Sequence, residues 1–154
     1  MGLLVVVNLH GMINVPHAAR KAMTELKVER RFSASLVKDD PTTVGMLRLC
    51  KDYIAWAPAD KELLTSLLKS RGKVSERKKL GEAELKKLGF QKYEDLASKL
   101  IDGGLKLSSF QGLRPFFKLS PPRGGFKEST RRHAGEGGVL GNNPKLTEIV
   151  KRMI

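Results

Sequence analysis

The sequence predicts a mixed fold of helices and strands, in which a β-α-β-α-β unit fills residues 1–58 and an extension follows. Three observations support this. The run Leu3–Val7 is short, apolar and rich in β-branched residues, as expected of a buried strand. Apolar residues alternate with others over 32–37, and a third short apolar segment, 53–57, ends at a proline. The segments between carry apolar residues at helical spacing, but periodicity alone leaves the strands free to run parallel or antiparallel.

Each element of this unit has local signals of its own. A first helix is expected over 15–27, because Pro16 suits a first helical turn and apolar residues follow it at helical spacing. The alternation over 32–37 predicts a half-buried strand. A second helix is expected over about 43–52, since the acids of Asp39-Asp-Pro41 precede it and acids favour the positive end of a helix dipole.

The extension is predicted to hold four more helices, three of them with apolar residues at helical spacing and a short one that stops at Gly89. They are expected between Asp60 and Arg71, at about 82–88, over 93–102 and over 146–153. The glycine-rich stretch 135–141 is expected to be a flexible or tightly turned connector. We therefore divide the chain into a core unit at 1–58 and a helical, loop-rich extension at 59–154 that packs on or beside it.

Composition and charge narrow the classes of function. The 154 residues are 40% hydrophobic, which suffices for one domain with a core. Twenty-nine Lys and Arg against 16 Asp and Glu give a net charge of +13, which favours nucleic acid or an anionic surface as partner. The single cysteine excludes an internal disulfide and a multi-cysteine zinc site. The apolar run at the N-terminus is too short to span a bilayer, so we expect a soluble, intracellular protein without a membrane partner.

The stretch 114–133 is the most informative part of the sequence. It combines five prolines and glycines with six cations and three phenylalanines, against a single acid. Cations neutralise phosphates and flat rings stack on unstacked bases, so an extended basic loop of this kind suits a nucleic acid. A surface loop whose phenylalanines anchor it in the core is the alternative, and the two interpretations are compatible. The candidate binding residues are Arg114, Lys118, Arg123, Gly124, Gly125, Phe126, Lys127, Arg131, Arg132 and His133.

Catalytic and metal-binding patterns are not evident elsewhere. The stretch 135–141 lacks the Gly-Lys-Ser/Thr of a phosphate-binding loop. His10 and His17 have no acid or cysteine at ligand spacing. Cys50 lies on the apolar side of a helix, where an inert thiol is expected. We therefore expect no enzyme, no cofactor and no small-molecule substrate. A nucleotide-binding enzyme and a free-standing nucleic-acid-binding regulator are the competing hypotheses.

Segments along essentially the whole chain match one family. The most specific is Phe117-Lys-Leu-Ser-Pro-Pro-Arg-Gly-Gly-Phe-Lys127, supported by Gly135-Glu-Gly-Gly-Val-Leu-Gly-Asn142. In the N-terminal half, Asn14-Val-Pro-His-Ala-Ala-Arg20 and Leu36-Val-Lys-Asp-Asp-Pro-Thr-Thr-Val-Gly-Met46 match too. With these residues the chain resembles the large-subunit ribosomal protein family L-thirty in its long archaeal form, whose eukaryotic counterpart is called L-seven.

This resemblance implies an α+β fold akin to ferredoxin-like folds, with a three-stranded antiparallel sheet in the β-α-β-α-β core and helices on one face. It also implies a non-catalytic structural constituent of the large ribosomal subunit, which binds large-subunit ribosomal RNA and stabilises its folded arrangement. The 5S ribosomal RNA and neighbouring ribosomal proteins would lie nearby. Arg20 and Lys21 in the first helix are secondary candidates for RNA contact, although a solvated helix face explains them at least as well.

Overall fold

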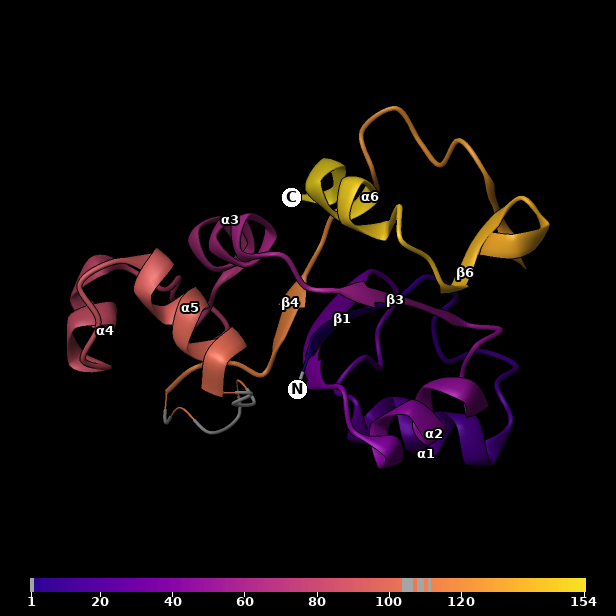
Figure 1. The fold of residues 1–154 in the computed structure, drawn as a ribbon, viewed down its shortest axis with the longest axis horizontal. Coiled ribbons are helices and arrows are strands. Elements are labelled where there is room, and N and C mark those ends of the chain that lie inside the picture. Colours follow the sequence, from indigo (N-terminus) through magenta and orange to yellow (C-terminus); the bar gives the residue numbers. More distant parts are fainter. Residues whose placement is uncertain (1, 104–106, 108–109, 111) are drawn as a thin grey trace.

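A computed structural model of the chain describes residues 2–103, 107, 110 and 112–154. Its first part is the predicted β-α-β-α-β unit (Figure 1). The five elements are β1 (Leu3–Asn8), α1 (His17–Glu25), β2 (Ser33–Lys38), α2 (Pro41–Leu49) and β3 (Ile54–Pro58). Each overlaps its predicted range and differs only at its ends, where sequence signals are least exact.

The extension contains the predicted helices and three strands that were not predicted. Its elements are α3 (Lys61–Arg71), α4 (Glu82–Lys87), α5 (Tyr93–Gly103), β4 (Phe116–Lys118), β5 (Ser129–His133), a 3-10 helix (Ala134–Glu136), β6 (Gly138–Asn142) and α6 (Leu146–Met153). None of the helices in this described part of the chain is long and apolar enough to cross a membrane.

The six strands found in the described residues join one sheet in the order β4-β2-β1-β3-β6-β5. The central strand β1 runs antiparallel to both neighbours, with Val5 opposite Leu36 of β2 and Ala57 of β3. The antiparallel core implied by the family resemblance is therefore confirmed. The sheet is wider than the three strands expected, because β4 adds antiparallel to β2 while β6 and β5 add in parallel beyond β3.

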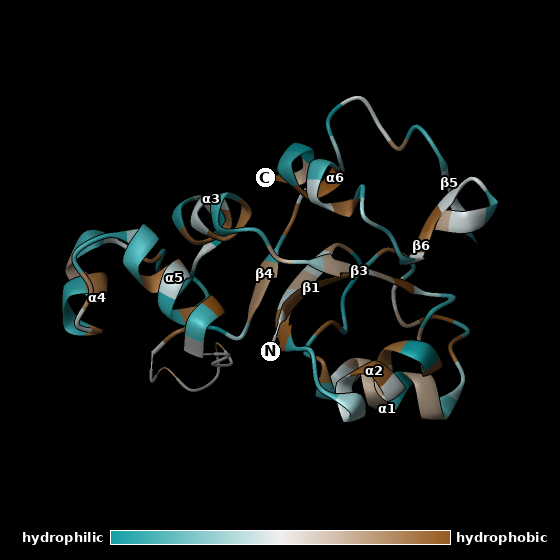
Figure 2. Cartoon of the chain, in the orientation of Figure 1, coloured by the Kyte–Doolittle hydropathy of each residue, from teal (hydrophilic) through white to brown (hydrophobic). Residues whose placement is uncertain are grey.

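Both faces of this sheet are covered by helices. On one face, Val6 packs with Met23 of α1 and with Leu47 of α2. On the other, Val5 belongs to a cluster with the leucines of α3 and with residues of α5 and α6. Figure 2 shows the corresponding apolar residues on the strands and along the helix sides that meet them. The expectation of helices on one face thus holds for α1 and α2, and the extension covers the opposite face.

The strand β2 is buried almost throughout, so the expectation of a half-buried strand is wrong. Two of the residues that alternate with its apolar ones are serines, and these are also inside. The hydroxyl of Ser33 donates a hydrogen bond to the carbonyl of Arg30, and that of Ser35 donates to the carbonyl of Leu26. A small hydroxyl satisfied by a nearby carbonyl can be buried at little cost, which alternation alone does not reveal.

The glycine-rich stretch 135–141 was expected to be a connector, and this holds only for its first part, where a 3-10 helix is capped at its C-terminal end by Gly137 with a φ of +77°. From Gly138 on the expectation is wrong, because the stretch forms β6, an internal strand between β3 and β5 whose Val139 and Leu140 are buried. A side chain at Gly138 would place its Cβ 2.0 Å from the carbonyl oxygen of Arg132. Glycine therefore allows β5 and β6 to approach closely, and turn propensity gave the wrong prediction.

Candidate nucleic-acid interface

The segment 114–133 links the two edges of the sheet. It contains β4 on one edge and β5 on the other. Between them the chain passes the C-terminal end of α6 and arches over to the β5–β6 side (Figure 1). The prolines and glycines of this segment predicted that it would not form a central strand. This is confirmed, since β4 and β5 are edge strands, in which fewer backbone groups need partners.

Backbone hydrogen bonds hold the middle of this segment against α6. The amide of Ser120 donates to the carbonyl of Met153 at 3.0 Å, and the amide of Arg123 donates to that of Arg152 at 3.1 Å. The guanidinium of Arg152 returns a hydrogen bond to the carbonyl of Gly125 at 3.1 Å. The segment is thus attached to α6 through its backbone amides and carbonyls, and these contacts do not involve the cationic side chains of the segment.

A tight turn presents Arg123 to the outside. The amide of Gly125 donates to the carbonyl of Pro122 at 3.0 Å, and Gly124 and Gly125 have φ angles of +77° and +72°. Glycine is the residue that adopts this region without strain. No heavy atom lies within 4 Å of the Cβ position of either glycine, among the residues the structure describes. The turn therefore offers an open backbone surface beside an exposed guanidinium.

Five of the six cations are exposed, and the sixth is half-buried. The exposed ones are Lys118, Arg123, Lys127, Arg131 and Arg132. Within the described residues, no carboxylate forms an ion pair with any of these five. The acid of the segment, Glu128, pairs instead with Lys145 of the α6 start at 3.0 Å. The positive charge of the segment is therefore available to an external anion.

Arg114 is the half-buried cation and has partners within the protein. Its guanidinium lies 3.4 Å from a carboxylate oxygen of Glu76 and 5.5 Å from the ring centroid of Phe116. The Glu76 side chain is 77% exposed, whereas that of Arg114 is 23% exposed. This pair therefore lies at the surface, next to β4.

The two residues predicted to stack on bases already have internal contacts. Phe126 stacks on Phe32 with ring centroids 6.3 Å apart and an interplanar angle of 25°. His133 places Nε2 at 2.8 Å from a carboxylate oxygen of Asp52. Phe117 is the ring that anchors the segment in the core, at 1% exposure. A base that stacked on Phe126 or His133 would have to use the remaining open side of the ring.

Arg20 and Lys21 lie apart from the other candidates. Both are exposed on α1, and the guanidinium of Arg20 donates to the carbonyl of Val15 at 3.3 Å. In Figure 1, α1 lies on the other side of the sheet from the arch formed by residues 119–128. The structure does not bring these two residues together with the C-terminal candidates.

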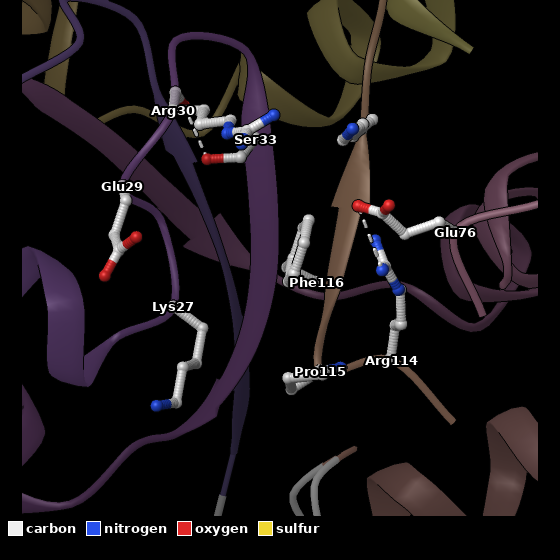
Figure 3. A pocket seen from close by; sticks show the side chains of 9 residues that line it. Lys27, Glu29, Arg30, Ser33, Glu76, Arg114, Pro115 and Phe116 are labelled. Carbon is white, nitrogen blue, oxygen red and sulfur yellow. Dashed lines mark hydrogen bonds and ion pairs between the residues drawn. The ribbon is translucent and has the colours of Figure 1, made fainter. Parts of the chain in front are cut away.

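The loop between α1 and β2 is a neighbour of β4 that the sequence analysis missed. A hollow of about 300 Å³ separates the two (Figure 3). Its walls are formed by Lys27, Glu29, Arg30, Ser33, Glu76, Arg114, Pro115, Phe116 and Lys118. The adjacent cations Arg30 and Arg31 were a signal in the sequence, but nothing there indicated that Arg30 faces β4.

Asn8 shapes this end of the sheet and was also missed. Its side chain is fully buried, and its amide nitrogen donates to the carbonyl of Val28 at 2.7 Å. Its side-chain oxygen accepts from the amides of His10 and Gly11 at 3.1 and 2.7 Å. One side chain therefore positions the loops that follow β1 and α1. Lys27 and Phe32, at positive φ, complete the second loop.

The Cys50 thiol agrees with the expectation of an inert buried cysteine. Burial raises the pKa of the Cys50 thiol to about 11, and its sulfur lies 3.3 Å from the carbonyl of Ala19. A thiol with such a pKa is protonated near neutral pH and is a poor nucleophile. No cluster of potential metal ligands occurs in the part of the chain that the structure describes.

Comparison with known proteins decides the family. Residues 4–54 match the sequence model of the family described as ribosomal protein L30p/L7e. A large ribosomal subunit protein uL30 from Nitrosopumilus maritimus is 38% identical over 98% of this chain and 97% of its own length. One from Thermofilum pendens is 38% identical over the full length of both chains, and one from Thermoplasma volcanium is 33% identical over 99% of this chain and 93% of its own.

The chain belongs to the ribosomal protein L30p/L7e family. This confirms the resemblance inferred from residues 117–127 and the N-terminal segments. The L30p/L7e family consists of structural, non-enzymatic ribosomal proteins, so the nucleotide-binding enzyme is set aside. The matched relatives are archaeal and similar in length to this chain, which agrees with the long archaeal form. The division at residue 58 stays a prediction.

Proposed function

We propose that this chain is a structural constituent of the large ribosomal subunit in the cytoplasm and that it binds large-subunit ribosomal RNA through segment 114–133. The observation that carries this proposal is that the segment runs from one edge of the sheet to the other and exposes five cations along the way. Among the described residues, no carboxylate forms an ion pair with these five cations. Family membership supports it, since the relatives are named as proteins of the large subunit. The 5S ribosomal RNA and neighbouring ribosomal proteins are proposed as further contacts.

The mechanism is neutralisation of phosphates without catalysis. Exposed Arg and Lys side chains displace counterions from the RNA backbone, which contributes binding free energy at moderate salt. The glycines at 124 and 125 leave room for the sugar-phosphate chain to approach the turn. Phe126 and His133 remain candidates for stacking through their open sides. Because the segment is already attached to α6, it loses less conformational entropy when it binds RNA than a free loop would.

A salt titration of RNA binding tests the contact at the turn. Arg123→Ala is expected to lower the slope of log affinity against log salt by about one, because one phosphate contact fewer releases fewer counterions. The probe is purified large-subunit RNA, and binding is measured by filter retention between low and moderate salt. Arg123→Lys keeps the charge and should keep the slope. Lys69→Ala, which removes an exposed cation of α3, is the remote control.

Sedimentation of the tagged chain from cell extract through a salt-containing sucrose gradient tests the wider proposal. We expect the chain to migrate with the large subunit and to remain with it at moderate salt. Recovery only at the top of the gradient would exclude an integral ribosomal role. It would favour the free-standing regulator, whose affinity for duplex DNA could then be measured directly. An unchanged slope for Arg123→Ala would remove only that residue from the interface.

A further inference from the structure

Among the residues that the structure describes, no helix covers one face of the edge strand β4. Side chains of adjacent strand residues point to opposite faces, so Phe117 enters the core beneath α3 while Phe116 and Lys118 point to the face of α1 and α2. The apolar cluster on that face joins α1 and α2 to β1, β2 and β3, and Phe116 is not part of it. Its ring is only half-buried, beside the hollow of about 300 Å³.

The hollow combines the groups that recognise an unstacked nucleotide. Figure 3 shows the Phe116 ring standing between a wall formed by the α1–β2 loop and a wall formed by Arg114 and Glu76. Four cations and two acids surround it, so the hollow is net positive. Its volume lies at the lower end of the roughly 300–1,000 Å³ typical of small-molecule sites. Aromatic rings on open sheet faces, flanked by cations, are a common means of stacking RNA bases.

We propose that this hollow receives one unstacked base of RNA, which stacks on Phe116 while Arg30 and Lys118 bind the adjoining phosphates. The proposal rests on the RNA-binding function proposed above and deepens it. Segment 114–133 would then hold the RNA backbone at its exposed cations and one base at β4. Arg30 lies in the α1–β2 loop, so the two halves of the chain contribute to one site.

The Glu76–Arg114 pair adds selectivity for the base. The two groups lie 3.4 Å apart, and the guanidinium lies over one face of the Phe116 ring, 5.5 Å from its centroid. The base therefore stacks on the opposite face and meets the carboxylate acceptor and the guanidinium donor only with the edge that extends beyond the ring. The edge of guanine offers the complementary set, because its N1–H and N2–H₂ groups donate to a carboxylate and its O6 accepts from a guanidinium. Uracil has a single ring N–H donor on its edge and cannot satisfy both oxygens of the carboxylate. We therefore expect guanine to be the preferred base.

The experiment uses two labelled RNA decamers, one of uridine only and one of uridine with a single central guanosine. Binding to the full chain is measured by fluorescence anisotropy at fixed salt and across a salt series. Phe116→Leu is expected to weaken binding of the guanosine decamer by about fivefold or more, the lower end of measured base–aromatic stacking. Its salt slope should stay unchanged. Phe116→Tyr, which keeps a ring, should restore the affinity.

Charge variants separate the pocket from general phosphate binding. Lys118→Ala should lower the salt slope by about 0.7, the value expected for one phosphate contact on a single strand. Glu76→Gln should reduce the preference for the guanosine decamer over the uridine decamer. Thermal melting of each variant shows whether β4 stays paired with β2.

Three outcomes would overturn the proposal. They are equal affinities of the wild type for the two decamers, an unchanged affinity for Phe116→Leu, and failure of the wild type to bind either decamer while it binds large-subunit RNA. None of these removes the RNA-binding function proposed above. That function is tested separately by the slope of Arg123→Ala on large-subunit RNA and by sedimentation with the subunit.

Discussion

The two ends of segment 114–133 are held to the protein in different ways. At the β4 end, Phe117 and Leu119 are buried in the core, and apolar packing fixes the strand. At the β5 end, the strand lies parallel to β6 with the two backbones close together. The polar pair of His133 and Asp52 joins this strand to the residues before β3. Apolar packing secures one end of the segment, and backbone proximity with a surface pair secures the other.

This difference suits the two ends to different contacts. The β4 end offers a shaped hollow in which acids and cations surround a ring, which can distinguish one base from another. The β5 end offers Arg131 and Arg132, exposed on an edge strand and suited to phosphates of any sequence. A single segment can therefore combine a selective contact with a general electrostatic one, because its two ends belong to different edges of the sheet.

The largest expected effect is on the apolar anchor of the β4 end. Phe117→Ala removes a ring that is 1% exposed and should lower the free energy of unfolding by about 3–5 kcal/mol. Urea denaturation followed by circular dichroism measures the change. Phe116→Ala, its half-exposed neighbour on the open face, is the matched control and should cost much less. Equal losses for the two variants would contradict the assignment of faces on β4.

At the β5 end, the close approach of the backbones is the sensitive feature. Gly138→Ala would place its Cβ 2.0 Å from the carbonyl oxygen of Arg132, so β5 and β6 must separate. We expect a loss of about 1–3 kcal/mol in the free energy of unfolding, as for other overpacked sites. Gly135→Ala is the control, because no described heavy atom lies within 4 Å of its Cβ position. A stable Gly138→Ala variant would mean that the strands are looser than the structure shows.

The exposed arginines of the β5 end should affect RNA binding and leave stability almost unchanged. Removing both, as Arg131→Ala with Arg132→Ala, is expected to lower the salt slope for large-subunit RNA by about two. The corresponding double change to lysine should keep the slope. Exposed residues without partners contribute little to folding, so the unfolding free energy should stay within about 0.5 kcal/mol. A wild-type slope in the double alanine variant would place the phosphate contacts elsewhere.

Sequence signals identified the helices and the core strands because those elements carry their own periodicity. The spacing of apolar residues in α3 and the β-branched run of β1 predict a helix and a strand without reference to any other part of the chain. The short strand β6 was missed because its glycines are typical of a connector. Glycine is needed at Gly138 because the carbonyl oxygen of Arg132, on the neighbouring strand β5, leaves no room for a side chain. Burial of Ser33 and Ser35 was missed for a similar reason, since carbonyls outside the strand satisfy their hydroxyls.

The candidate interface was predictable in its charge and unpredictable in its shape. Composition alone located the cations of 114–133, and their exposure agrees with that interpretation. The hollow at β4 depends on pairing between β2 and β4, which lie about eighty residues apart in the sequence. No local pattern places Arg30 opposite Phe116. Asn8 was missed likewise, because its three hydrogen bonds join loops that only the fold brings together.

The smallest expected effect concerns the polar pair that joins the β5 end to the core. His133→Gln and Asp52→Asn each weaken a partly exposed pair, so each should lower the free energy of unfolding by less than about 1 kcal/mol. If His133 also stacks on a base through its open side, only His133→Gln should weaken RNA binding, because Asp52→Asn keeps the ring. The loss should be smaller than for the arginine pair. Equal RNA affinities for the two variants would assign His133 a purely structural role, and the β5 end would then bind RNA through charge alone.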